Sequence, residues 1–134
     1  MSTFIATAKR LLFAETDMSG WAHNSHFMRF VENAEHELLQ SYGYQPVTQK
    51  GGWPRANFQI DFLSPLVFND PYQVTLTLMR LGGSSITWGF EIHSDQRAVA
   101  KGQMTSVLVN EQGRPVRIPD DIRSSLRQTF ELSD

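Results

Sequence analysis

The chain has no cysteine among its 134 residues. That absence excludes thiol nucleophiles, disulfide bonds and thiolate metal sites, so any chemistry must come from oxygen and nitrogen groups. Long apolar runs are missing as well, since no stretch approaches the roughly 20 residues that a membrane-spanning helix needs. The first residues show no pattern of a cleaved signal segment. We therefore expect a cytoplasmic protein without a membrane partner.

The chain also lacks an excess of charge of either sign. It carries 12 Lys and Arg against 14 Asp and Glu, for a formal net charge of -2. No basic surplus is available to attract nucleic acid or an anionic membrane surface. No internal repeat or low-complexity linker divides the sequence, and its length suits one core. We predict a single domain over residues 1–134 that does not bind nucleic acid.

One segment has the period of a helix. From Ser25 onward apolar residues recur at offsets of three and four, and polar residues such as Glu35 take the other positions. The apolar stripe consists of Phe27, Phe30, Val31, Ala34, Leu38 and Tyr42. Asn24 or Ser25 can cap the first turn, and Gly43 can close the last one in the left-handed conformation. The pattern predicts a long amphipathic helix that ends near Gly43.

The remaining segments are mostly typical of strands. Residues 3–13 are rich in Thr, Ile, Phe and Leu, and the later segments alternate apolar with polar residues. The later strands are predicted at 56–62, 72–78, 86–92 and 98–110. The pair Gly82-Gly83 predicts a hairpin through positive φ. Pro119-Asp120 begins a short terminal helix with apolar residues at four-residue spacing.

The predicted order of elements is β-α-β-β-β-β-α. We predict an α+β fold in which a curved antiparallel sheet, a meander of four strands after the helix, wraps around one long central helix. A single chain of this kind leaves one sheet edge unpaired. We therefore expect edge-to-edge assembly into a homo-oligomer.

Reactive side chains concentrate in residues 15–27, directly before the predicted helix. This segment holds the carboxylate of Asp17, the imidazoles of His23 and His26, and Asn24. A helix N-terminus presents unpaired N–H donors and a partial positive charge. A thioester carbonyl docked on the N–H of Asn24 would gain negative charge where donors already point. Asp17 could then attack the carbonyl or activate a water molecule.

The same segment has other interpretations. Asp17 can simply cap a turn, with His23 and His26 as ordinary polar residues. A metal site made of these three side chains is a further alternative, because these residue types ligate zinc or iron. The motifs H-E-x-x-H, G-x-S-x-G and the phosphate-binding P-loop do not occur, which excludes the best-known zincin, α/β-hydrolase and P-loop sites.

The segment 15–20, which reads Glu-Thr-Asp-Met-Ser-Gly, resembles the signature of the hotdog-fold thioesterases of the 4-hydroxybenzoyl-CoA thioesterase family. The residues that continue the resemblance are Asn24, Phe27, Phe30, Glu32, Ala34, Glu35 and Leu38, followed by the segments 58–66, 69–70 and 80–85. The resemblance implies a hotdog fold and hydrolysis of an acyl-CoA without a cofactor. It also implies a homodimer or a dimer of dimers, that is, a homotetramer.

By this resemblance Asp17 is the catalytic carboxylate, and the N–H of Asn24 polarises the thioester carbonyl. His23 is a third catalytic candidate, although many members carry a Tyr-His pair where this chain has His23-Asn24. The candidates for substrate binding are Gly20, Phe27, Phe58, Ser84, Ser85 and Arg80, with Lys101 as a second cation for the phosphates of CoA. Trp53 and Trp88 could also line the acyl pocket, although core packing explains aromatic residues at such spacing.

Two other functions fit the same residues. A hotdog hydratase or dehydratase would act on the α,β-carbons of an acyl thioester and would need an acid/base pair on that side of the substrate. A non-catalytic acyl-CoA binding module would keep the pocket but would not need the carboxylate of Asp17. Thiol release and hydration of an enoyl-CoA distinguish these functions.

Overall fold

The computed structural model describes residues 2–44 and 51–132. Its elements, in chain order, are β1 (Phe4–Ile5), β2 (Lys9–Arg10), the 3₁₀ helices η1 (Phe13–Glu15) and η2 (Asn24–His26), α1 (Phe27–Ser41), β3 (Arg55–Phe62), β4 (Pro71–Leu81), β5 (Ser85–Ser94), β6 (Arg97–Val107) and α2 (Asp120–Thr129). No helix in the described part of the chain is long and apolar enough to cross a membrane.

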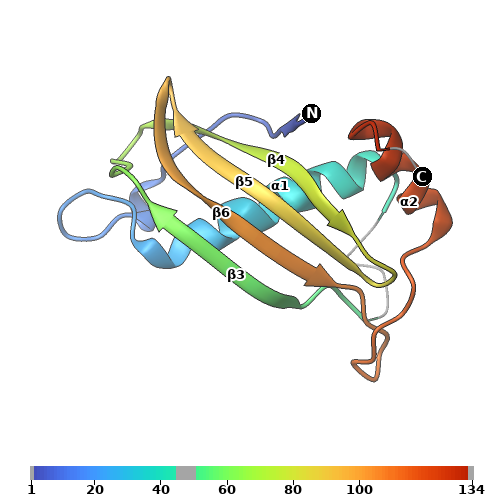
Figure 1. Ribbon diagram of the computed structural model, residues 1–134. Coiled ribbons are helices and arrows are strands. Elements are labelled where there is room, and N and C mark those ends of the chain that lie inside the picture. Colours follow the sequence, from blue (N-terminus) through green and yellow to red (C-terminus); the bar gives the residue numbers. More distant parts are fainter. Residues whose placement is uncertain (1, 45–50, 133–134) are drawn as a thin grey trace.

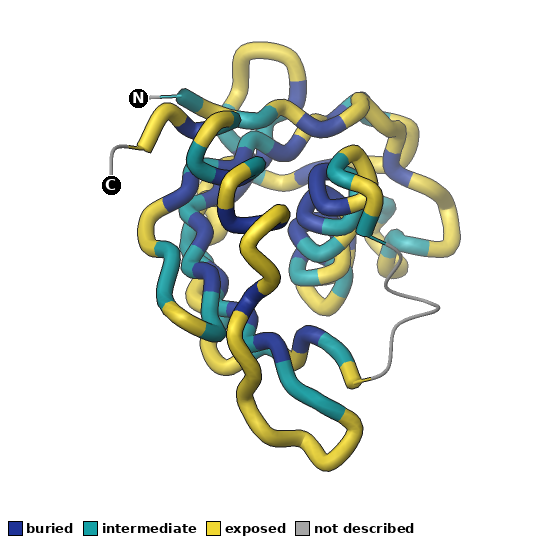
Figure 2. The backbone as a smooth tube through the Cα atoms, turned by 90° about the vertical axis from the view of Figure 1, so that its right-hand side faces the viewer, coloured by how far each residue is buried: buried dark blue, intermediate teal, exposed yellow. Residues whose placement is uncertain are grey.

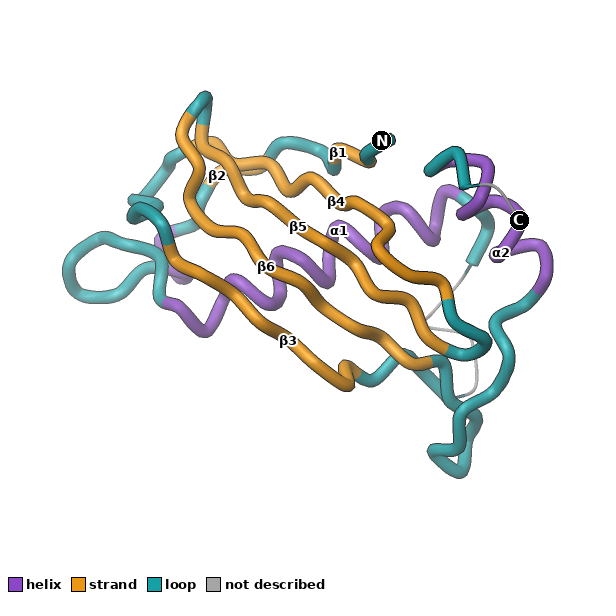
Figure 3. Tube along the Cα trace, viewed as in Figure 1, coloured by secondary structure: helices purple, strands orange, loops and turns teal. Residues whose placement is uncertain are grey.

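The sheet lies across the long helix α1, as Figures 1 and 3 show. All strand pairs are antiparallel, and the strand order is β1-β4-β5-β6-β3, with β2 also paired to β4. Buried residues of the sheet and of the helix stripe face one another in the side view of Figure 2. The predicted α+β hotdog fold and the predicted element order are thereby confirmed.

The predicted meander is wrong, because β3 pairs with β6 rather than with β4. This order places β5 and β6 in the middle of the sheet, where the side chains of Trp88 and Met104 are fully buried. β3 lies at the edge of the sheet, and its residues Ala56 and Phe62 are exposed. The central strands thus bury large apolar side chains that the edge strand exposes, as the burial of apolar area favours.

The N-terminal strand is shorter than predicted. Ile5 pairs with Thr75, whereas Lys9 pairs with Tyr72, so the register shifts by one residue between β1 and β2. At this irregularity the N–H of Thr7 leaves the strand ladder and donates to the carboxylate of Glu37 on α1, at 3.0 and 3.1 Å. The bulge therefore ties the edge of the sheet to the helix.

The hairpin between β4 and β5 forms where it was predicted, but not by positive φ. The described glycines with positive φ are Gly20, Gly43, Gly51 and Gly113. At Gly82 the turn is crowded instead, since a Cβ there would lie 2.6 Å from the hydroxyl oxygen of Ser85, whose side chain would have to rotate. The prediction for the helix end is correct, since Gly43 has a φ of 87°.

Glu35 was expected on the polar side of α1, but it is fully buried. One carboxylate oxygen accepts from Arg55 Nη1 at 2.8 Å. The other accepts from the indole N–H of Trp88 at 2.6 Å and from the hydroxyl of Ser106 at 2.8 Å. Four residues after Val31, Glu35 continues the buried stripe, and these donors replace the water that the carboxylate loses. We call these four residues the Glu35 network.

Candidate active site

Asp17 lies on a tight hairpin between η1 and η2. Its N–H donates to the carbonyl of Trp21 at 2.8 Å, and its own carbonyl accepts the N–H of Gly20 at 3.1 Å. Gly20 has a φ of 83°, which explains why glycine occupies this position. The N–H of Phe68 donates to Gly20 at 2.8 Å and the N–H of Ala22 donates to Leu66 at 2.7 Å. The hairpin is thereby fastened to the loop that follows β3.

The carboxylate of Asp17 is held by Ser19. One oxygen accepts the N–H of Ser19 at 2.8 Å and its hydroxyl at 2.5 Å. These two hydrogen bonds are the main reason why the pKa of Asp17 is lowered from 3.8, with smaller contributions from Trp21 and His23. The side chain is exposed, so the structure presents an ionised and accessible carboxylate at neutral pH. The carboxylate of Asp17 thus closes its own turn and still remains available as a nucleophile or base.

The helical segment that begins at Asn24 offers an unpaired donor. The N–H of Ser25 donates to the ring Nδ1 of His23 at 3.2 Å, and the N–H of His26 donates to the carbonyl of His23 at 3.1 Å. The N–H of Phe27 donates to the carbonyl of Asn24. Within the described residues, no hydrogen bond occupies the N–H of Asn24. Asn24 therefore supplies the donor that is open to a ligand.

An apolar hollow of about 260 Å³ lies beside Asn24. Asn24 and Phe27 line it on one side, and Phe62 with the residues after β3 lines it on the other. The rings of Phe27 and Phe62 are 5.3 Å apart in an edge-to-face arrangement. Three of its lining side chains, Trp21, Phe62 and Leu63, are exposed apolar residues, and Phe13, Met18 and Phe68 are exposed in the neighbouring segments of the chain. A patch of this kind is typical of a binding or subunit surface.

The histidines of this segment have different positions from those expected of a metal site. Nδ1 of His23 is occupied by Ser25, and the rings of His23 and His26 meet edge to face with centroids 6.4 Å apart. In the described part of the chain, no group of three His, Asp or Glu side chains is placed to hold a metal ion. The predicted cap by Asn24 or Ser25 is wrong, because the acceptor at the helix start is the imidazole of His23.

The structure brings together only some of the predicted substrate-binding residues. Phe27 lines the hollow beside Asn24, and Gly20 shapes the adjoining hairpin. Phe58 instead stacks on Phe90, with ring centroids 5.4 Å apart. Ser84, Ser85 and Arg80 lie at the β4–β5 hairpin, at the opposite end of the sheet.

The strand register shows how far the β4–β5 hairpin lies from the hollow. Phe62, at the hollow, pairs with Ala100, whereas Ser85 pairs with Val107, next to the partner of Arg55. Seven residues along a strand span roughly 20 Å. Trp88 belongs to the core, where its indole binds Glu35, and Trp53 is also buried.

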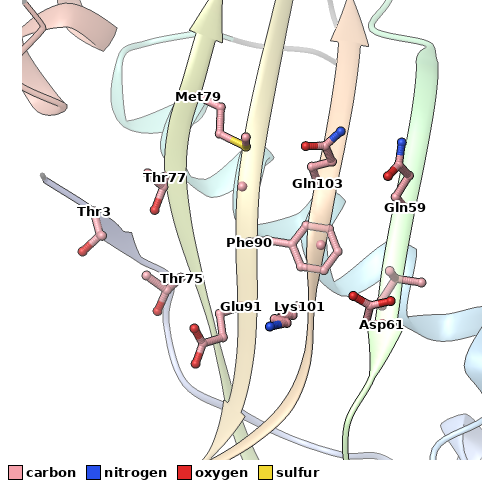
Figure 4. Close-up of a pocket in the computed structure, with 13 residues that line it drawn as sticks. Thr3, Gln59, Asp61, Thr75, Thr77, Met79, Phe90, Glu91, Lys101 and Gln103 are labelled. Atoms are coloured by element: carbon pink, nitrogen blue, oxygen red, sulfur yellow. The ribbon is translucent and has the colours of Figure 1, made fainter.

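A larger hollow, of about 590 Å³, lies on the sheet face turned away from α1 (Figure 4). Lys101 lies in it, between Glu91 on β5 and Asp61 on β3 in the strand register, and none of the predicted catalytic residues lines it. Lys101 therefore lies on a different face of the molecule from Asn24.

A hydroxyl–imidazole–carboxylate chain borders this second hollow. The hydroxyl of Thr75 lies 3.0 Å from Nε2 of His93, whose Nδ1 lies 3.0 Å from the carboxylate of Glu91. These residues sit within the paired strands β4 and β5, where ladder hydrogen bonds engage the backbone donors. These strands offer no open N–H to receive an oxyanion. We therefore interpret Thr75, His93 and Glu91 as a set of cross-strand polar contacts.

Sequence reasoning missed part of the hollow beside Asn24. Trp21, Leu63 and Leu66 line it, together with Ser64 and Pro65. These residues belong to two loops that meet only through the hydrogen bonds between the hairpin and residues 66–68, so no periodic pattern could join them. A weak indication existed in the apolar run Phe62-Leu63 just before Pro65, which lies beyond the alternating part of the strand.

The chain is similar in sequence to known thioesterases and esterases. A family model described as the thioesterase-like superfamily matches residues 11–126. A protein of Aquifex aeolicus (strain VF5) that carries an esterase name is 30% identical over 122 residues, which cover 89% of this chain and 94% of that protein. A 1,4-dihydroxy-2-naphthoyl-CoA hydrolase of Synechococcus sp. (strain WH7803) is 29% identical over 145 residues, with 96% and 92% covered.

Solved structures support the fold. The crystal structure of a 1,4-dihydroxy-2-naphthoyl-CoA thioesterase from Synechocystis superposes with a TM-score of 0.82 at 19% identity. The superposition covers 92% of this chain and 95% of that one. At this identity the likeness concerns the arrangement of helix and sheet.

Proposed function

The chain belongs to the thioesterase-like superfamily and is a thioester hydrolase, and we propose that it hydrolyses an acyl-CoA with Asp17 and the N–H of Asn24 as its catalytic groups. The observation that carries this proposal is the N–H of Asn24, which has no hydrogen-bond partner among the described residues, in a residue that lines an apolar hollow and follows the hairpin with the ionised carboxylate of Asp17. Family membership supports hydrolysis over the alternatives of dehydration and of binding without turnover.

The proposed chemistry uses these groups in sequence. The thioester oxygen accepts the N–H of Asn24, so negative charge that develops on it meets a fixed donor and the positive end of the helix. Asp17 either attacks the carbonyl carbon or takes a proton from the water that attacks it. The C–S bond breaks, the CoA thiolate takes up a proton, and water supplies the OH of the free acid.

We propose that the acyl group occupies the hollow beside Asn24. Its walls are mainly aromatic and aliphatic, and its volume of about 260 Å³ suits a compact acyl group rather than a long chain. The related hydrolase from Synechococcus is named for an aromatic substrate, which agrees with an aryl or other compact acyl group.

Subunit pairing would complete the site. Among the described residues no strand pairs with the outer side of β3, and antiparallel pairing of two such edges about a two-fold axis would place the residues near Arg55 alongside those near Phe62 of the partner subunit. The hairpin end of the partner, with its Ser84, Ser85 and Arg80, would thereby approach the Asp17 end of this chain. We propose a homodimer of this kind, or a dimer of dimers.

Replacing Gln59 by Lys tests this assembly. Gln59 is exposed near the middle of β3, so Gln59→Lys would place two like charges close together across the two-fold axis. We expect light scattering to show a dimer or tetramer for the native chain and a monomer for the variant. Gln96→Lys, the same change at an exposed position of the β5–β6 turn, is the matched control and should leave the mass unchanged. A dimeric Gln59→Lys variant would refute the pairing.

Thiol release from a panel of CoA esters tests the proposed activity. The panel contains acetyl-, hexanoyl-, palmitoyl- and benzoyl-CoA, and we expect benzoyl- or hexanoyl-CoA to give the highest kcat/KM. Enoyl-CoA hydration is followed in parallel. Hydration without thiol release would favour the hydratase, and tight binding without either reaction would favour a binding module. Preferred hydrolysis of palmitoyl-CoA would contradict the assignment of the compact hollow.

A further inference from the structure

His23 makes both interactions of a helix-capping residue. Its Nδ1 lies 3.2 Å from the backbone N of Ser25 and 2.8 Å from the Ser25 hydroxyl oxygen. Its carbonyl accepts the N–H of His26. These bonds from residues 25 and 26 return to residue 23 and enclose Asn24, so they hold the peptide unit that carries the Asn24 N–H. Side-chain caps are usually Ser, Thr, Asp or Asn, and here an imidazole takes their place.

The donor determines the tautomer of the ring. A backbone N–H can only donate, so Nδ1 of His23 must present its lone pair and the ring proton must lie on Nε2. Protonation of the ring would put a second N–H against that of Ser25, and the cap would be lost. The cap therefore requires the neutral ring with its proton on Nε2.

We propose that His23 is a positioning residue that holds the N–H of Asn24 toward the thioester oxygen by capping the helix through Nδ1. The proposal depends on the proposed function for the identity of that oxygen. His23 itself need not touch the substrate, because it acts through the backbone of Asn24 and Ser25. This role explains why a histidine can stand directly before the donor residue.

The groups around the ring define how turnover should depend on pH. His23 faces Asp17 from the preceding hairpin and the ring of His26 from η2. Ser19 lowers the pKa of Asp17 from 3.8, so Asp17 stays ionised from pH 5 to pH 8. Protonation of the His23 ring would break the cap, so a fall in kcat on acidification that disappears when His23 is replaced would come from loss of the cap.

Substitutions at His23 test the proposal through kcat, KM and the pH profile of thiol release. His23→Leu removes the acceptor at similar size, and we expect about a tenfold loss of kcat, less than the 10²–10³-fold loss on deleting a donor outright. KM should change little. His23→Asn supplies an oxygen acceptor that does not titrate, so it should restore kcat and abolish the fall at acid pH. His26→Asn is the matched control and should keep that fall.

A second experiment, NMR of the ring nitrogens, measures the tautomer of His23 directly. The ¹⁵N shifts of His23 should show an unprotonated Nδ1 and a protonated Nε2 near pH 7.5, and the amide signal of Ser25 should move as the ring titrates. The opposite tautomer, or native kcat in His23→Leu, would overturn the proposal while the proposed function stands. A native protein without thiol release would instead overturn the proposed function, and the ¹⁵N shifts would still decide whether His23 caps the helix.

Discussion

Asp17→Asn is expected to lower kcat for thioester hydrolysis by at least about 10³-fold, because an amide can neither attack the carbonyl nor take a proton from water. The amide oxygen of Asn can still accept the N–H of Ser19, so the turn that Asp17 caps should persist. Thiol release at pH 7.5 measures the loss, and KM should change far less than kcat. The expected loss therefore reports on chemistry rather than on the shape of the hairpin.

Two further variants separate the catalytic role of Asp17 from its role in the turn. Ser19→Ala removes the hydroxyl bond to the carboxylate, which weakens the turn and lets the pKa of Asp17 rise toward 3.8, still far below neutrality. We expect it to keep kcat within a few-fold at pH 7.5. Asp61→Asn makes the same chemical change at an exposed position of β3 and should be silent. Equal losses in Ser19→Ala and Asp17→Asn would show that Asp17 serves only the turn.

The sequence was most informative where a pattern repeats over many residues. The apolar stripe from Phe27 predicted α1, and alternation predicted the strands, because the helical and extended periods each leave a regular trace. Strand order has no such trace. The pairing of β3 with β6 depends on which strands cover the helix best, and it joins segments such as Phe62 and Ala100 that are far apart in the chain.

The candidate site also has parts that the sequence could predict and parts that it could not. Asp17 and Asn24 could be named because they flank a helix start, and the position of a helix start follows from periodicity. The capping role of His23 could not be named, because a capping acceptor is recognised by the geometry of one ring nitrogen. The hollow was missed because two loops form it. Glu35 was assigned to the wrong side because its type is polar, although its spacing from Val31 and Leu38 matches the buried stripe.

Arg55→Met is expected to destabilise the fold by about 3–5 kcal/mol, the usual cost of removing one member of a buried ion pair. Glu35 has no exposed surface, so without Arg55 its charge would be left with only Trp88 and Ser106 as donors. Unfolding in urea measures the loss.

Controls for the Glu35 network come from its own neighbours. Glu32 pairs with Nε of Arg55 at 2.8 Å from a side chain that is 32% exposed, so Glu32→Gln should cost less than about 1 kcal/mol. The double variant Glu35→Leu with Arg55→Met removes both charges together and should recover most of the stability that Arg55→Met loses. Recovery is expected because an uncompensated charge, rather than the lost attraction, dominates the cost. A double variant that stays as unstable as Arg55→Met would mean that the paired charges are a net source of stability relative to apolar side chains of similar size.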